Sequence, residues 1–118
     1  MSPKNEAERE KKMLQVQELG LEAIRELKPL VVRIKTFDRD LANQLVRAAS
    51  SVVLNIAEGH GSRAGNRRLR YESAQGSANE VRAALAVAIA WGYVAEQDAA
   101  KAERLLDRVV AMLWKLAR

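Results

Sequence analysis

The stretch QLVRAASSVVLNIAEG, residues 44–59, decides the fold, because its apolar and polar side chains separate onto two faces of one helix. The apolar row repeats every three or four residues, which is the period of an α-helix packed against neighbours. A polar row lies beside it, with spacings of three, four, four and three: Gln44, Arg47, Ser51, Asn55 and Glu58. Polar groups next to a core destabilise the fold unless each finds a partner. The stretch therefore predicts a core helix whose polar row pairs with another part of the chain.

The partner segment is residues 72–80, where a second group of polar residues follows at helical spacing. We expect one structural polar network made of Gln44, Arg47, Ser51, Asn55, Glu58, Glu72, Ser77 and Glu80. Within it we expect an Arg47–Glu80 ion pair, because a guanidinium and a carboxylate can form two parallel hydrogen bonds. A metal or acid–base site on the carboxylates of this network is the alternative. The chain has a single histidine, so it lacks the Glu-x-x-His pairs of di-iron bundles, and we expect no metal.

Length and composition favour one all-α domain over residues 1–118. The chain has two prolines and six glycines, and residues that favour helices dominate it. The periodicity predicts helices over residues 6–35, 39–58, 67–91 and 97–117, with residues 1–12 as a frayed extension. The three connections are short, which favours an antiparallel up-down-up-down four-helix bundle.

Residues that cap or end helices lie between these segments. Asp38 or Thr36 is expected to cap the second helix and Asn66 the third. Gly59 and Gly61 are expected to end the second helix and Gly92 the third, since glycine adopts the left-handed conformation that closes a helix.

Two residues lie inside predicted helices although they disfavour them. Pro29 removes a backbone donor and is expected to kink the first helix or split it near Leu27. Gly76 costs about 1 kcal/mol relative to alanine in a helix, so we expect it to allow the close approach of a neighbouring backbone.

The sequence also argues against several classes of protein. Cysteine is absent, which excludes disulfides and thiolate chemistry. The first twelve residues are highly charged and lack the apolar core of a signal peptide. The longest apolar run, residues 83–95, is shorter than the roughly 20 residues that a membrane-spanning helix needs. We therefore expect a cytoplasmic protein with no membrane association.

Positive charge gathers in one segment. Residues 59–70, GHGSRAGNRRLR, contain four arginines and no acidic residue, and the rest of the chain carries a net charge of only about +1. Arg63, Arg67, Arg68 and Arg70 are therefore the candidate nucleic-acid-binding residues. Only Tyr71 adds an aromatic ring next to them, which argues for contact with the phosphate backbone and against base stacking. A run of solvated surface arginines is the alternative interpretation.

No catalytic residue is predicted. The single histidine, His60, is expected to be an exposed loop residue whose protonation the nearby arginines disfavour. No Ser-His-Asp or Cys-His arrangement can be inferred, and the spaced glycines of residues 59–65 do not follow a strand as a nucleotide-binding motif requires. We expect a protein without enzymatic activity or cofactor.

Apolar residues beyond one helical seam point to self-association. The surplus residues are Leu14, Leu19, Leu21, Leu30 and Val32 in the first helix and Val110 and Trp114 in the last. A subunit interface explains them, although single leucines on a surface are also common.

The motif QLxRAAxSVxxNIAEG, the basic loop after it, AxGSAxE at residues 74–80 and the pair Gly92-Tyr93 resemble a known bacterial family of four-helix bundles, the 23S rRNA intervening sequence proteins. The accessory variability determinant of diversity-generating retroelements is similar, and the resemblance covers residues 14–116. It implies a homopentameric ring and, by analogy with the retroelement proteins, RNA or DNA and a reverse transcriptase as partners. We therefore expect a non-enzymatic, oligomeric nucleic-acid-binding or accessory protein. A structural protein–protein interaction scaffold with no nucleic-acid role is the alternative.

Overall fold

The computed structural model describes residues 3–118, and these residues form four helices. They are α1 (Pro3–Lys35), α2 (Arg39–His60), α3 (Ala64–Ala90) and α4 (Glu96–Leu116). No strand occurs in the described part of the chain. The predicted all-α class is confirmed, and each predicted helix is present with its ends shifted by at most three residues.

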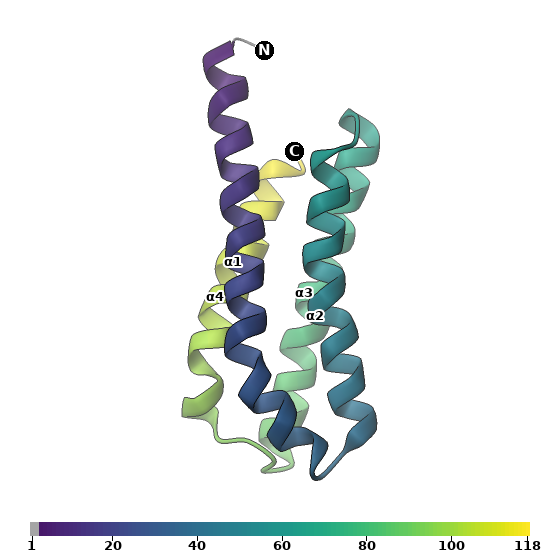
Figure 1. Cartoon of the computed structure of the whole chain (residues 1–118), viewed down its shortest axis with the longest axis vertical. Helices are drawn as coiled ribbons and strands as arrows, with labels where there is room; N and C mark the ends of the chain where they lie inside the picture. Colours follow the sequence, from purple (N-terminus) through teal and green to yellow (C-terminus); the bar gives the residue numbers. More distant parts are fainter. Residues whose placement is uncertain (1–2) are drawn as a thin grey trace.

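The four helices pack side by side around one core (Figure 1). Each contacts two others: α1 packs on α2 and α4, and α3 packs on the same two. Both chain termini lie at one end of the molecule together with the α2–α3 turn, and the other two connections lie at the opposite end (Figure 1). We call the first the terminal end, made of residues 3–17, 55–76 and 110–118, and the second the loop end.

The core takes apolar residues from all four helices. Its largest fully enclosed side chains include Tyr71, Leu27, Ile34, Leu85 and Leu113. The α3 face that meets the core is rich in alanine, which lets α2 and α4 approach it closely.

None of the helices in residues 3–118 combines the length and the apolar character that crossing a membrane requires.

Two leucines that the sequence placed at a subunit interface belong to this core. Leu19 and Leu30 are buried inside the single chain, so that prediction was wrong for them. Because α1 packs on both α2 and α4, its buried stripe is wider than one seam and takes these residues in. Leu21 and Val110 are half-buried, and exposed apolar surface remains at Leu14, Val32 and Trp114.

The helix ends agree only in part with the predicted caps. Asp38 caps α2 as predicted, because the Leu41 amide donates to Asp38 Oδ1 over 3.0 Å. Gly92 has a φ of 77°, the left-handed conformation expected of it after α3. The cap predicted at Asn66 was wrong. Helix α3 begins earlier, at Ala64, with Arg63 in the cap position and no side-chain hydrogen bond there.

Gly59 does not end α2. The helix continues to His60, and Gly59 is buried where α2 meets the ring of Tyr71. A Cβ atom at position 59 would lie 2.4 Å from Tyr71 Cε1, so this glycine is required by packing. Gly61 follows at the cap with φ of −86°, which is also not the left-handed conformation.

The close approach predicted at Gly76 was also wrong. Gly76 is exposed, and a Cβ atom there would meet no heavy atom within 4 Å.

Helix α1 is longer and more continuous than expected. Residues 3–12, predicted to fray, belong to the helix, whereas residues 1 and 2 lie outside the described range. Pro29 lies within the helix and does not split it. The last turns of α1 lean toward α2 (Figure 1), in keeping with the kink that a proline produces.

Candidate functional site

Three residues of the predicted polar network meet between α2 and α3. Asn55 Nδ2 donates to the Ser51 carbonyl oxygen over 2.9 Å and to Ser51 Oγ over 3.0 Å. Ser77 Oγ donates to the same Ser51 hydroxyl over 2.9 Å. All three side chains are half-buried. Ser51 Oγ therefore accepts from both side chains, and its bond with Ser77 joins the two helices through a hydrogen-bonded seam.

The other members of the network lie elsewhere. Glu58 Oε2 is 2.9 Å from Arg70 Nε, and Glu72 Oε1 is 2.8 Å from Arg68 Nε. Gln44, Arg47 and Glu80 are exposed. The hydrogen-bonded network thus contains three of the eight predicted residues. Two of the others, Glu58 and Glu72, pair with arginines instead.

The Arg47–Glu80 ion pair is not formed among residues 3–118, so that prediction was wrong. The two positions lie at about the same level of the α2–α3 pair, as the Ser51–Ser77 contact shows. At that level, however, the buried residues of the two helices include Ala48 and Val81. Arg47 and Glu80 each precede a buried residue by one position, which directs them away from the contact.

Substitutions in this seam test which polar groups stabilise the fold. We expect Ser77→Ala to lower the free energy of unfolding by roughly 0.5–1 kcal/mol, because it removes one hydrogen bond between helices. Arg47→Ala removes an exposed side chain and should change it by less than about 0.5 kcal/mol. Urea unfolding of both variants measures the difference. A larger loss for Arg47→Ala than for Ser77→Ala would contradict the arrangement.

The four candidate arginines do not form one surface. Arg67 lines a cavity against α1, Arg68 lies in a groove beside α4, and Arg70 lies in a groove beside α2. Successive residues of a helix point about 100° apart, so neighbours in sequence reach different faces of α3. Arg63 is exposed at the start of α3. The sequence cluster is therefore divided among three faces, and two of its charges are paired with glutamates.

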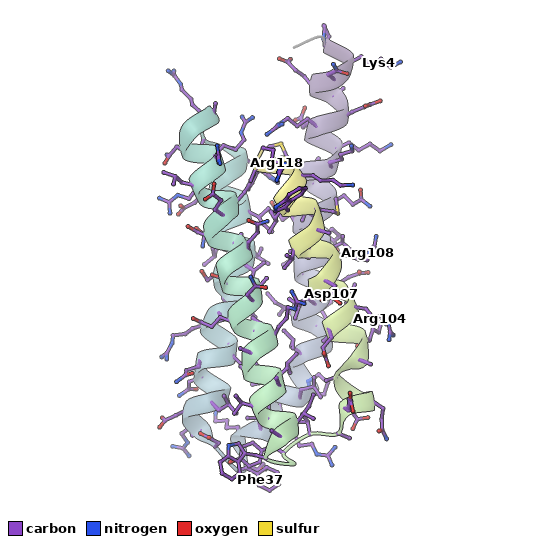
Figure 2. The ribbon with its side chains drawn as sticks, turned by 180° about the vertical axis from the view of Figure 1, so that it is seen from behind. Lys4, Phe37, Arg104, Asp107, Arg108 and Arg118 are labelled. Atoms are coloured by element: carbon purple, nitrogen blue, oxygen red, sulfur yellow. The ribbon has the colours of Figure 1, made fainter. Side chains whose placement is uncertain are left out.

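The fold nevertheless gathers positive charge at one end. The terminal end contains ten lysines and arginines and five acidic residues, whereas the rest of the chain contains ten of each. The net charge of +5 thus belongs entirely to the terminal end. Figure 2 shows Lys4 and Arg118 at this end and Phe37 at the other. Three segments that are far apart in sequence contribute to it, and only one of them was singled out from sequence.

A cavity of about 420 Å³ opens at the terminal end between α1 and the α2–α3 turn. Its lining is Glu6, Arg9, Glu10, Met13 and Leu14 from α1, together with His60 and Arg67. Arg9 is held in place because its Nη2 donates to the Leu116 carbonyl oxygen over 2.8 Å, which ties α1 to the end of α4. No sequence signal marked Arg9, since it lies in the segment expected to fray.

Four buried polar atoms at the terminal end have no hydrogen-bond partner among the described residues, and three of them belong to side chains that line the cavity. They are Arg9 Nε, His60 Nε2, Arg67 Nε and Tyr71 Oη. Leaving a buried donor unsatisfied costs about 1–3 kcal/mol, and more when the group is charged. All four lie at the terminal end, which makes it the one place in residues 3–118 where buried polar groups of this kind are found.

Burial also shifts two pKa values here. The pKa of His60 lies below its ordinary value, chiefly because burial disfavours the charged ring, while a hydrogen bond with the Met13 backbone opposes this and the Arg67 charge adds to it. The expectation of an exposed loop histidine was wrong, because His60 is the half-buried last residue of α2. Burial raises the pKa of Tyr71, and the charges of Arg67 and Arg9 act in the opposite direction. The guanidinium groups of Arg9 and Arg67 therefore lie close enough to influence the pKa of Tyr71, and that of Arg67 also influences the pKa of His60.

Residues 3–118 contain no group of three or more His, Asp or Glu side chains that could hold a metal ion.

An aromatic cluster that was not predicted from the sequence lies at the loop end. Phe37 stacks on Tyr93 with ring centroids 5.0 Å apart, and Trp91 stacks on Tyr93 at 6.5 Å. The three residues come from the two loop-end connections, so only their meeting in the fold reveals the cluster.

These features define a small all-α protein of four helices, with a hydrogen-bonded seam between α2 and α3 and a basic end that holds a polar cavity. A family profile described as 23S rRNA-intervening sequence protein matches residues 7–115. The chain belongs to this family, as its central motif indicated. No curated protein and no solved structure matched the chain in the same comparisons.

Proposed function

We propose that this protein is a non-enzymatic, oligomeric nucleic-acid-binding or accessory protein that contacts the phosphate backbone through its terminal end. The observation that carries the proposal is the placement of the whole net charge of +5 at that end. An excess of positive charge at one end of a protein attracts a polyanion, whose counterions are released on binding.

The arrangement favours backbone contact without base recognition. Arg68 and Arg70 share their charge with glutamates on the surface, and such exposed pairs are weak enough to rearrange toward a phosphate. The aromatic cluster lies at the loop end, opposite the terminal end that carries the net positive charge (Figure 2). Contacts of this kind give affinity that depends strongly on salt and weakly on sequence.

Fluorescence anisotropy with labelled RNA and DNA, as duplexes and single strands across a salt series, tests the proposal. Replacing Arg63, Arg68 and Arg70 with alanine should weaken binding about evenly for all sequences. The slope of log K against log salt should flatten by up to about 0.9 for each phosphate that the variant no longer neutralises. The matched control replaces Lys28, Lys35 and Arg39, which are exposed and carry the same total charge near the loop end. Binding should then stay close to that of the wild-type protein.

Two results would contradict the proposal. One is an equal loss of affinity in both triple variants, which would show that the total charge matters and not its place. The other is the absence of binding at low salt from a sample whose mass, measured by light scattering, shows an oligomer.

For the assembly we propose an up-down-up-down bundle that forms a homopentameric ring, as the family resemblance implies. Exposed apolar residues support contact between copies of the chain. Val32, Val46 and Leu54 are 62%, 45% and 64% exposed, and the first two line a shallow apolar groove between α1 and α2. A second copy of this chain is the occupant we propose for that groove, since apolar surface of this kind is usually covered in an oligomer.

A protein interaction scaffold is the second candidate, and the loop-end aromatic cluster favours it. Trp91 is 71% exposed and Phe37 61% exposed although both stack on Tyr93, so a large apolar surface is held in a fixed position. Aromatic residues of this kind dominate protein interfaces. The partner would be a protein, and by analogy with the retroelement relatives a reverse transcriptase. If the anisotropy of the labelled nucleic acids does not change when a protein shown to be oligomeric is added, this candidate is favoured.

A further inference from the structure

The cavity at the terminal end has donors that no group in the described chain uses. Arg9 and Arg67 reach it from α1 and α3, and His60 reaches it from the end of α2. One nitrogen of each of these three side chains is buried and lacks a hydrogen-bond partner among residues 3–118. Two of the three are guanidinium N–H groups, which can only donate. Neither guanidinium N–H group therefore has an acceptor among the described residues.

The acidic residues nearby do not supply that acceptor. Glu6 and Glu10 line the cavity but are exposed, and neither forms an ion pair with Arg9 or Arg67 among the described residues. Arg9 is held by its bond to the Leu116 carbonyl oxygen, and its Nε is one of the buried atoms without a partner. The two guanidinium groups are thus placed by the fold and not by carboxylates.

We propose that this cavity binds the phosphate group of a phosphomonoester, with Arg9 and Arg67 donating to its oxygens and His60 beside them. A guanidinium matches two oxygens of a phosphate at once, and two such groups suit a dianion better than a single carboxylate. A phosphomonoester carries close to two negative charges at pH 7. The cavity, at about 420 Å³, lies within the size range of small-molecule sites, so it has room for an organic group as well as the phosphate.

The electrostatics of the neighbours support a site for an anion. The Arg67 charge acts on the pKa of both His60 and Tyr71, and the Arg9 charge acts on that of Tyr71. Tyr71 is fully buried behind this region, and its hydroxyl also lacks a partner among the described residues. The two arginine charges therefore act on the buried polar groups beside the cavity, while Glu6 and Glu10 supply two acidic side chains to its exposed lining.

This site goes beyond the proposed function. Contact with a nucleic-acid backbone uses exposed residues and phosphodiesters, each with one negative charge, whereas the cavity is suited to a terminal phosphate. The same chemistry is found in a small phosphorylated metabolite and in the 5′-phosphate at the end of a nucleic-acid strand. The experiment separates these two sources.

Isothermal titration calorimetry of the full chain, at constant ionic strength in chloride, measures the binding of methyl phosphate. We expect saturable binding, weakened at least tenfold in Arg67→Gln and in Arg9→Gln. The control is Arg39→Gln, which removes the same charge from an exposed residue at the start of α2, at the loop end and outside the cavity lining. That variant should bind within about twofold of wild type. Glu10→Gln should strengthen binding, because it removes a competing carboxylate from the lining.

Further arms identify the ligand class. A 5′-phosphorylated dinucleotide that binds more tightly than methyl phosphate, while the same dinucleotide without the phosphate does not bind, assigns the site to a strand end. Equal binding of methyl phosphate and the phosphorylated dinucleotide assigns it to small phosphomonoesters. If acetate binds as tightly as methyl phosphate, the assignment of a phosphate site is overturned.

Other outcomes also overturn the proposal. They are no heat of binding from the wild-type protein, and an equal loss of affinity in Arg39→Gln and Arg67→Gln. Should Arg67→Gln fail to fold, Arg67→Lys keeps the charge and removes the two-point contact, and it should still weaken binding severalfold. Loss of methyl phosphate binding with unchanged affinity for unphosphorylated duplexes separates this site from the backbone contact of the proposed function.

Discussion

Gly59→Ala is expected to destabilise the protein by about 2 kcal/mol, although alanine favours a helix more than glycine by about 1 kcal/mol. The added Cβ would lie 2.4, 2.8 and 3.2 Å from three atoms of the Tyr71 ring. That ring is fully buried, so it has no free space into which it can move. Overpacking of a rigid core typically costs about 1–3 kcal/mol, and here the contact is close enough to outweigh the gain in helix propensity.

Gly76→Ala supplies the matched control. The substitution is the same and the residue also lies inside a helix, but the new Cβ would meet nothing within 4 Å. We expect it to stabilise the protein by up to about 1 kcal/mol. Urea unfolding of both variants would therefore show changes of opposite sign. Stabilisation by Gly59→Ala would show that α2 does not pack closely on the Tyr71 ring. In the background Tyr71→Leu, the effect of Gly59→Ala should become smaller, because the ring that the Cβ meets is gone.

Leu113→Ala should have the largest effect on stability, a loss of about 3–4 kcal/mol. Leu113 is fully buried on α4 within the core, so the substitution removes apolar contacts and leaves a cavity that its neighbours fill only in part.

Leu69→Ala removes the same atoms from an exposed position on α3 and serves as the control. It should change the free energy of unfolding by less than about 0.5 kcal/mol. Thermal unfolding followed by circular dichroism, at a protein concentration kept constant for all variants, measures both effects. Similar losses for the two leucines would contradict the assignment of α4 to the core.

The helices themselves were predictable because they rest on local physics. The apolar spacing of residues 44–59 repeats with the period of a helix, and that repeat is visible in any window of the sequence. Asp38 and Gly92 act within a few residues of themselves, so their roles as cap and terminator could also be predicted. The central motif likewise led to the correct family.

The candidate site was predictable only where neighbours in sequence are also neighbours in space. Ser51, Asn55 and Ser77 meet because two of them share one helix face and the third lies across a short turn. The four arginines are close in sequence, yet they separate onto three faces because a helix turns about 100° per residue. Which arginine points into a cavity depends on where α1 packs, and no local pattern contains that information.

The sequence by itself determined that this chain forms helices, where most of them begin and end, and which family it belongs to. Each of these depends on spacing along one segment, where periodicity and capping act over a few residues. Only the tertiary structure decided that Gly59 accommodates Tyr71, and that Arg9 and Arg67 share a cavity with His60. The same holds for the net charge of +5, which three distant segments bring to one end. These features arise when the helices pack, because packing alone brings together side chains that are far apart in the chain.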